Sequence, residues 1–187
     1  MKKTSLILFL FINCTNSFSQ NMFNAVSGTV SFFSHAPIED IKAENKQAAS
    51  FINSATNEIA VVIPIRNFHF AKALMEEHFN EKYMESDKFP MASFKGIIQD
   101  SIATLADGEH LVSTKGTITI HGVEKELEIK GVFKRDGNSF TIISDFKVAL
   151  KDFNITIPKL LFQNIAEIID VNVTLDYRAS GKTIINK

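Results

Sequence analysis

The chain has 187 residues, of which 45% are hydrophobic and 22% are charged, a composition typical of a globular domain with one substantial core. Its formal charge of −1 at pH 7 provides no basic surface for nucleic acid or for an anionic membrane. The single cysteine, Cys14, lies near the N-terminus, so the rest of the chain has no thiol for a disulfide, a thiolate metal site or a cysteine nucleophile.

The N-terminal segment has the pattern of an export signal. Two lysines precede the apolar run Ser5–Ile12, and Ser17-Phe18-Ser19 has the small-x-small pattern of a cleavage site. The run is shorter than the roughly 20 residues that span a bilayer. We therefore expect a signal peptide over residues 1–19 and a periplasmic or secreted domain over residues 20–187, whose formal charge is −3 after two lysines are lost from −1. Acylation of Cys14 is an alternative, although the three residues before it lack the small side chains that usually precede a lipidated cysteine.

Alternation of apolar and polar residues starts at Val26 and predicts strands. Val26 is expected on the same face as Val30 and Phe32, and the polar stretch Glu39–Asn45 is expected to interrupt the pattern. The first three strand candidates are Val26–Phe32, Lys46–Asn53 and Ile59–Ile65.

Helical spacing replaces the alternation over Arg66–Met84. Leu74, Met75, His78 and Phe79 recur at the spacing of one helix face, and Asp87–Pro90 ends the segment. This predicts a short helical insert between the third and fourth strands.

Strand patterns resume after the insert and continue almost to the C-terminus. His121-Gly122 and Asp136-Gly137 are turn signals between neighbouring strands, and Lys159–Ala166 is a short helix-like stretch. The later strand candidates are the strand carrying Phe94 and Ile98, the hairpin Leu111–Lys134, the strand Phe140–Leu150 and the strand Val171–Tyr177. About eight strands with local connections fit a closed antiparallel barrel, although a two-sheet sandwich would show the same alternation.

Several small residues share the apolar parity of these strands, namely Gly28, Ala92, Gly96 and Ser144. Small residues beside large ones can leave an interior unfilled, and a lipid chain would occupy such a space. The alternative is that Gly28 and Gly96 only relieve strand coiling. The 17 phenylalanines and the absence of tryptophan suit a dry tunnel and an ordinary core equally well.

No catalytic arrangement is apparent. His78 and Glu81 are three residues apart on the helical segment and could face one metal ion, but no HExxH pattern or third ligand accompanies them. Nucleophile-elbow, phosphate-loop and dinucleotide motifs are absent from the sequence. We expect no catalytic residue, no metal site and no cofactor, and therefore a protein that is not an enzyme.

Two segments carry a resemblance to a known family. The helix-to-strand segment His78–Gly96 (HFNEKYMESDKFPMASFKG) and the hairpin Thr117–Gly131 (TITIHGVEKELEIKG) resemble the YceI-like family of exported, lipocalin-like barrels. The resemblance implies an eight-stranded antiparallel barrel with a short helical insert between strands 3 and 4, and polyisoprenoid-like ligands held inside it. The Asp-x-x-His-Ser opening common in the family is absent here.

The resemblance and the inward parity together predict a non-enzymatic protein that sequesters a polyisoprenoid, a fatty-acyl lipid or another long-chain amphiphile. The residues expected to line the tunnel are Phe32, Phe94, Ile118, Phe133, Phe146 and Leu175, and those expected to cover one mouth are Leu74, Phe79, Tyr83 and Met84. The alternative is a stress-response or interaction module with a filled core that acts through a protein partner. The sequence leaves the oligomeric state open, with a homodimer as one arrangement, and predicts no nucleic-acid partner and no transmembrane segment after residue 19.

Overall fold

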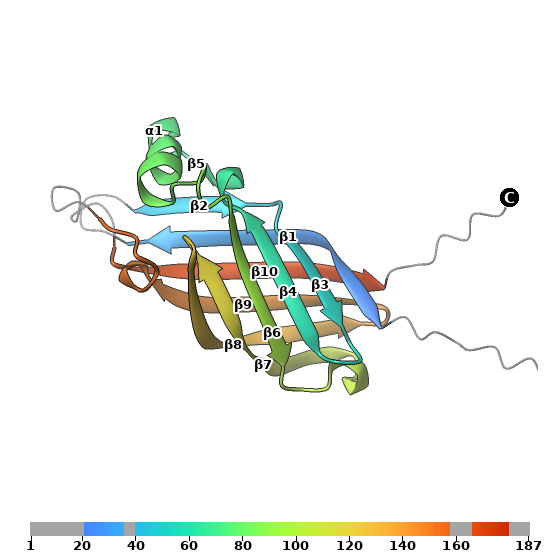
Figure 1. Cartoon of the computed structure of the whole chain (residues 1–187). Coiled ribbons are helices and arrows are strands. Elements are labelled where there is room, and N and C mark those ends of the chain that lie inside the picture. The colour runs from blue at the N-terminus through green and yellow to red at the C-terminus, as the bar shows by residue number, and fades with distance from the viewer. Residues whose placement is uncertain (1–20, 36–39, 158–165, 180–187) are drawn as a thin grey trace, which may run out of the picture.

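Eight antiparallel strands close into a ring in the computed structural model, which describes residues 21–35, 40–157 and 166–179 (Figure 1). The predicted signal peptide lies outside the described residues, as does the helix-like stretch Lys159–Ala166 except for its last residue. The ring follows the order β1-β3-β4-β6-β7-β8-β9-β10, and β10 pairs back to β1 from Phe23↔Ala179 to Phe33↔Asp170. The predicted eight-stranded barrel is therefore confirmed, and the two-sheet sandwich is excluded.

The strands are β1 (Met22–Ser34), β2 (Ile41–Asn45), β3 (Ala49–Asn53), β4 (Glu58–Pro64), β5 (His69–Phe70), β6 (Met91–Ile98), β7 (Gly108–Ile120), β8 (Val123–Asp136), β9 (Ser139–Ala149) and β10 (Ile168–Ala179). The helical elements are η1 (Ile65–Asn67), α1 (Ala73–His78), the π-helical turn η2 (Phe79–Tyr83), η3 (Ile102–Thr104) and η4 (Leu150–Phe153).

The insert lies between β4 and β6, which are the third and fourth strands of the ring, as the sequence predicts. It is less uniformly helical than expected, because η1 and the short strand β5 precede α1. It lies over one end of the barrel, on the side where η4 also lies (Figure 1).

The polar stretch Glu39–Asn45 contains the strand β2, which the sequence pattern does not predict. The strand pairs with the second half of β1 and extends the ring locally. Asn45 is fully buried there. Its amide nitrogen donates to the carbonyl of Pro64 at 2.7 Å, and its Oδ1 accepts from the backbone N–H of Gln47 at 2.7 Å. Two hydrogen bonds thus allow a polar residue where alternation alone would expect an apolar one.

The expectation that Val26 shares a face with Val30 is wrong. The pairing of β1 with β10 shifts between Ala25 and Ser27, which is a β-bulge with Val26 as the extra residue. Val26 is consequently 59% exposed, whereas Val30 is buried. A single inserted residue reverses the parity before it, and no sequence signal marks it.

The turn between β7 and β8 forms where the sequence predicts it. His121 and Gly122 have φ angles of 51° and 74°, the left-handed values that a two-residue hairpin turn with the twist of a sheet requires. An added Cβ at Gly122 would lie 2.5 Å from the ring of Phe89, so a larger residue is excluded sterically as well. This turn therefore packs against the chain that follows the insert.

Candidate ligand-binding cavity

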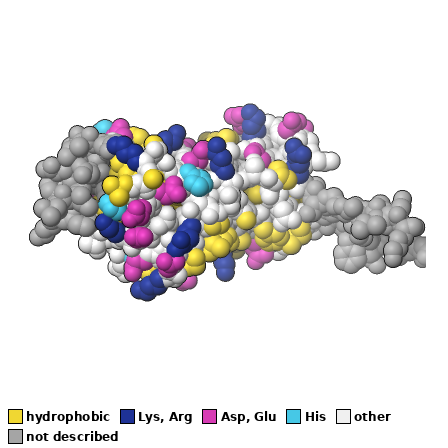
Figure 2. Space-filling model, turned by 90° about the horizontal axis from the view of Figure 1, so that it is seen from above, with side chains coloured by type: hydrophobic (Ala, Val, Ile, Leu, Met, Phe, Trp, Pro, Cys, Tyr) yellow, Lys and Arg dark blue, Asp and Glu magenta, His cyan; other side chains and the backbone are white. Residues whose placement is uncertain are grey.

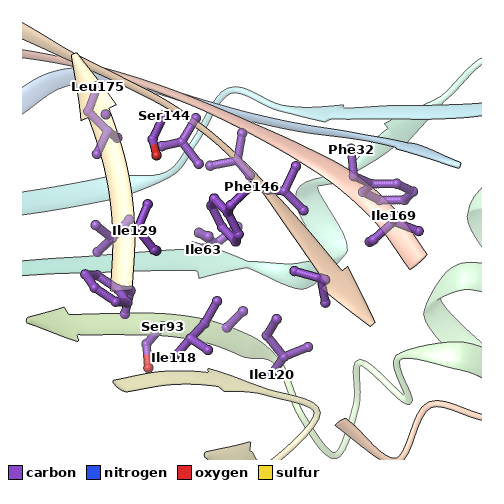
Figure 3. Close-up of a pocket in the computed structure, with 18 of the residues that line it drawn as sticks. Phe32, Ile63, Ser93, Ile118, Ile120, Ile129, Ser144, Phe146, Ile169 and Leu175 are labelled. Carbon is purple, nitrogen blue, oxygen red and sulfur yellow. The ribbon is translucent and has the colours of Figure 1, made fainter. Parts of the chain in front are cut away.

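The barrel interior contains a cavity of about 150 Å³. Figure 3 shows its lining side chains converging from strands on opposite sides of the ring, with Leu175 toward one end and Phe32 and Ile169 toward the other. All the lining residues are apolar except Ser93, Thr114, Lys130, Gly131 and Ser144. An apolar cavity of this size stays dry and accepts nonpolar guests.

The hydroxyl of Ser144 does not make this interior polar, because it donates to the carbonyl of Lys130 at 2.7 Å. Its hydrogen is therefore already used within the sheet. The cavity has hydrocarbon walls along most of its length and suits a chain without polar groups.

The small residues on the inward face divide into two groups. Ala92 and Ser144 border the cavity. An added Cβ at Gly28 would lie 2.1 Å from the carbonyl oxygen of Ala48, and one at Gly96 would lie 2.8 Å from the ring of Phe94. The two glycines therefore permit close packing and leave no empty space, so only the first group creates room for a ligand.

A second cavity of about 380 Å³ lies at the end of the barrel that the insert covers. It shares Phe32, Leu150, Ile155 and Ile169 with the inner cavity, so the two adjoin. We call this second space the mouth cavity. Its lining includes Lys72, His78 and Tyr83, so it is the more polar of the two.

Partial burial raises the pKa of the Tyr83 phenol. The phenol therefore stays neutral near pH 7 and can both donate and accept a hydrogen bond. The mouth cavity thus combines apolar walls with polar groups, among them the neutral phenol of Tyr83 and the ammonium of Lys72.

Rings from the insert and from β1 pack together around the mouth cavity. Phe79 has its ring centroid 5.6 Å from that of Phe32, 5.6 Å from that of Phe68 and 5.0 Å from that of Phe70. Since Phe32 borders both cavities, this ring cluster connects the insert to the tunnel wall.

The opposite end of the barrel is filled by stacked aromatic rings. Phe140 has its centroid 4.7 Å from that of Phe133, 4.7 Å from that of Tyr177 and 5.0 Å from that of Phe23. The Tyr177 hydroxyl lies 2.6 Å from the Ser50 Oγ, which itself donates to the carbonyl of Ala60 at 2.8 Å. This closed end leaves the mouth as the place where a ligand would enter.

The structure brings nine of the ten predicted site residues to one of the two cavities. Phe32, Met84, Phe94, Ile118, Phe146 and Leu175 border the inner cavity, and Phe32, Leu74, Phe79 and Tyr83 border the mouth cavity. Phe133 borders neither, because its ring is fully buried in the stack at the closed end.

Other lining residues were not singled out from the sequence. Ile120, Ile129 and Val171 share the inward parity of predicted residues on their strands, so the same signal could have found them. Leu150 shares the parity of Phe146 at the end of the predicted strand Phe140–Leu150, so it too could have been found. Ile155 lies in the loop after η4, where no period indicates which side chains point inward.

His78 and Glu81 do not converge. His78 borders the mouth cavity, whereas Glu81 borders a separate polar hollow that also contains Glu77. Within the described residues no three His, Cys, Asp or Glu side chains are placed to hold a metal ion. The helical spacing that suggested a shared ligand is broken because α1 ends at His78 and continues as a π-helical turn.

Charges of both signs are interspersed over the face shown in Figure 2, and no part of it carries a single sign. In the part of the chain that the structure describes, no helix is long and apolar enough to cross a membrane.

Comparisons with known proteins agree with this geometry. A polyisoprenoid binding domain from Saccharophagus degradans, implicated in plant cell wall breakdown, matches with a TM-score of 0.75 at 15% identity, covering 84% of this chain and 98% of that chain. Burkholderia cenocepacia BcnA matches with a TM-score of 0.67 at 15% identity, covering 80% and 95% of the two chains, respectively.

The YceI protein of Campylobacter jejuni matches with a TM-score of 0.63 at 15% identity, covering 79% of this chain and 90% of that chain. At this identity the three structures show a shared fold alone. No curated protein matches the chain. The model of the YceI-like domain matches residues 8–178, and the chain therefore belongs to the YceI-like domain family.

Proposed function

We propose that this protein is an exported carrier that holds a polyisoprenoid or another long-chain amphiphilic lipid inside its barrel. The observation that supports this most directly is the apolar inner cavity, which adjoins a more polar mouth cavity. An amphiphile fits this order, with its chain in the inner cavity and its polar end beside His78 and Tyr83. The similar structure from Saccharophagus degradans is a polyisoprenoid binding domain, and a polyisoprenoid has such a chain.

The energy of an empty interior favours a carrier over a module with a filled core. Leaving about 150 Å³ unfilled costs roughly 3–4 kcal/mol at about 24 cal/mol per Å³ of cavity. A bound chain offsets this cost, whereas a barrel that acted only as a scaffold would gain by filling the space with larger side chains. The N-terminal sequence pattern supports export, and an exported carrier would act in the periplasm or outside the cell.

Extraction with organic solvent followed by mass spectrometry tests the proposal. Protein incubated with a membrane extract of its host, or with prenyl and acyl lipids, and then repurified is expected to yield a prenyl or acyl lipid in a fixed ratio to protein. A folded preparation that neither retains nor takes up any prenyl or acyl chain would contradict the proposal.

Two neighbouring residues of β4 give a matched pair of variants. Ile63 borders the inner cavity, whereas Val62 is exposed on the outer face. Ile63→Trp is expected to fill part of the cavity and to reduce lipid uptake at least tenfold, while Val62→Trp leaves uptake unchanged. Because the chain has no other tryptophan, the fluorescence of each variant also reports whether the indole lies in an apolar or an aqueous environment. Equal uptake by the two folded variants would place the ligand outside the cavity.

A further inference from the structure

His121 connects three segments at the rim of the mouth. Its Nε2 lies 2.9 Å from a carboxylate oxygen of Glu85, and its Nδ1 lies 3.1 Å from the backbone carbonyl oxygen of Phe153. The imidazole also packs edge-to-face on Phe89 with the ring centroids 4.5 Å apart. We call Glu85, His121 and the Phe153 carbonyl the rim cluster. It ties the end of the insert to the β7–β8 turn and to η4.

Left-handed backbone gathers at the same place. Among the described residues, four other than glycine have a positive φ, and three of them are Glu85 at 41°, His121 at 51° and Asn154 at 55°. Residues held in this conformation cost free energy and persist when the surrounding contacts hold them. The rim cluster supplies such contacts, so its loss would release the segments that it joins.

The two hydrogen bonds of His121 require one more proton than a neutral imidazole and a carboxylate possess together. The carbonyl oxygen of Phe153 can only accept, and an ionised Glu85 carboxylate can only accept. Both ring nitrogens of His121 must then donate, which makes the ring an imidazolium, unless the extra proton sits on Glu85. Either way the two hydrogen bonds depend on one shared proton, and without it one of them is lost.

The rim cluster adjoins residues that form the cavity wall. Met84 precedes Glu85, is 6% exposed and borders the inner cavity. On the other side Leu150, in the same short helix as Phe153, borders both cavities. Separation of Glu85 from His121 would therefore free Met84 to move away from the wall formed by η4.

Other charged groups on these segments already have surroundings of their own. The Lys88 ammonium lies over the Phe89 ring, 4.8 Å from its centroid, and Lys125 pairs with Asp152 at 3.7 Å. Within residues 85–90, 121–125 and 150–154, which meet here, the remaining charged residues are Asp87, Glu124 and Lys151. Glu85 is the carboxylate in hydrogen-bond contact with His121.

We propose that the rim cluster is a proton-dependent latch that holds the insert over the mouth, closed when the His121–Glu85 pair carries its shared proton and loosened when the proton leaves. Opening therefore increases as pH rises. Control of lipid retention by the latch rests on the proposed carrier function, but opening itself is measured without any lipid.

A cysteine at position 84 reports the opening. The reporter is Met84→Cys in a Cys14→Ser background, so that the protein has one thiol. Its rate of reaction with dithiodipyridine is measured from pH 5 to pH 8 with no lipid added, and is divided by the rate of a free cysteine peptide at the same pH. The normalised rate is expected to rise about tenfold across this range. Amide hydrogen exchange of residues 79–85 in the unaltered chain, corrected for intrinsic exchange, is expected to show the same trend.

Substitutions of Glu85 separate the proton from the contact. A glutamine can donate its amide N–H to a neutral His121 Nε2 while His121 Nδ1–H donates to Phe153, so Glu85→Gln is expected to keep the rate low and independent of pH. Glu85→Ala is expected to give a high rate at every pH. Glu81→Gln, on the same segment but facing the polar hollow, is expected to behave like the parent.

The latch would be overturned if neither the thiol reaction of the Met84→Cys reporter nor the hydrogen exchange of the unaltered chain changed with pH. It would also be overturned if Glu85→Gln in the reporter kept the same dependence of the reaction rate on pH. These outcomes leave the carrier function standing, because none of them involves lipid. Failure to bind lipid would likewise contradict the carrier function without changing the result for the latch.

Discussion

The two ends of this barrel are built from the same kind of residue but differ in how completely they are filled. At the closed end Phe133, Phe140 and Tyr177 stack with neighbouring centroids 4.7 Å apart, and all three are buried. At the mouth Phe32 and Phe79 also pack together, with centroids 5.6 Å apart, but Phe32 borders two cavities. Aromatic content therefore does not by itself distinguish a core from a binding site.

The difference arises from the elements that carry the rings. The aromatic side chains at the closed end belong to neighbouring strands of the barrel, where paired residues such as Tyr177 and Phe140 face each other in register. At the mouth, Phe68 and Phe79 come from parts of the insert outside the strand ladder, and Phe70 lies in the two-residue strand β5, which pairs with β2 beyond the closed ring. A cover of this kind packs against the rim and leaves space beneath it.

Truncation of one aromatic side chain at each end is expected to give the largest difference in stability between the two ends. Phe133→Ala is expected to cost about 3–5 kcal/mol of unfolding free energy, because its site is fully packed. Phe79→Ala is expected to cost only about 1–2 kcal/mol, because part of its surroundings is already empty. Denaturant unfolding of both variants measures the costs, and equal losses would mean that the two ends are equally well packed.

Addition of two methyl groups tests the contrast from the opposite direction. Ala92 borders the inner cavity, and Ala92→Val is expected to stabilise the lipid-free protein by about 1 kcal/mol and to weaken lipid uptake. Ala43 is buried and borders neither cavity, so Ala43→Val is expected to destabilise by about 1–3 kcal/mol through overpacking. Thermal unfolding of the lipid-free variants shows the sign of each change. Destabilisation by Ala92→Val would mean that the space beside it is not available to a side chain.

Alternation predicts the strands of the ring better than the mouth, although the bulge at Val26 interrupts it near the closed end. The parity of β6 correctly places Phe94 and Ile98 inside and Lys95 outside, because each strand of the ring is wet on one face and buried on the other. Parity also brings Phe133 inside, but it cannot tell whether an inward residue meets a cavity or another ring. That distinction depends on the residues opposite, such as Phe140, which are fixed only when the ring closes.

The mouth depends on individual contacts that the hydrophobic periodicity of the sequence does not predict. The buried Asn45 in β2 requires a hydrogen bond to Pro64, which is 19 residues away in the chain. The separation of His78 from Glu81 follows from a change of helix type after the six residues of α1. The two contacts of the rim cluster span 36 and 32 positions of the chain, and both are made by a histidine that a turn signal alone would explain. Contacts of this range are outside what sequence spacing can predict.

The two tyrosines lie one at each end, so their ionisation separates the ends spectroscopically. Burial raises the pKa of both phenols, and it raises that of Tyr177 far more, with the Ser50 hydrogen bond opposing the shift. A raised folded-state pKa means that the stability contribution is fully present below pH 10.0, the unfolded value, and is lost as pH rises above it. We expect tyrosinate absorbance to show Tyr83 ionising first and Tyr177 only as the protein unfolds.

Variants of each tyrosine assign the two steps. Tyr83→Phe is expected to remove the early step, and Tyr177→Phe is expected to cost about 1 kcal/mol near pH 7 and to reduce the loss of stability in alkali. An early step that persists in Tyr83→Phe would show that the closed end admits hydroxide, contrary to its packing.

Two aspartates of β10 extend the contrast to the outer surface with the smallest expected effect. Asp176, beside Tyr177, accepts hydrogen bonds from Ser27 at 2.6 Å and Thr141 at 2.7 Å, and these bonds hold the pKa of its carboxyl below its usual value. Asp170, toward the mouth, pairs only with the exposed ammonium of Lys147 at 2.5 Å among the contacts of the described residues.

Because the pKa of Asp176 is lowered in the folded state, its contribution is present above pH 3.8 and is lost as pH falls below that value. Asp176→Asn is expected to cost about 0.5 kcal/mol at pH 7, a value reduced by solvent screening, and to flatten the acid limb of the stability profile. Asp170→Asn is expected to have no measurable effect on stability. Urea unfolding from pH 3 to pH 7 measures both, and an equal cost at the two positions would show that the strand is held no more firmly at the closed end than at the mouth.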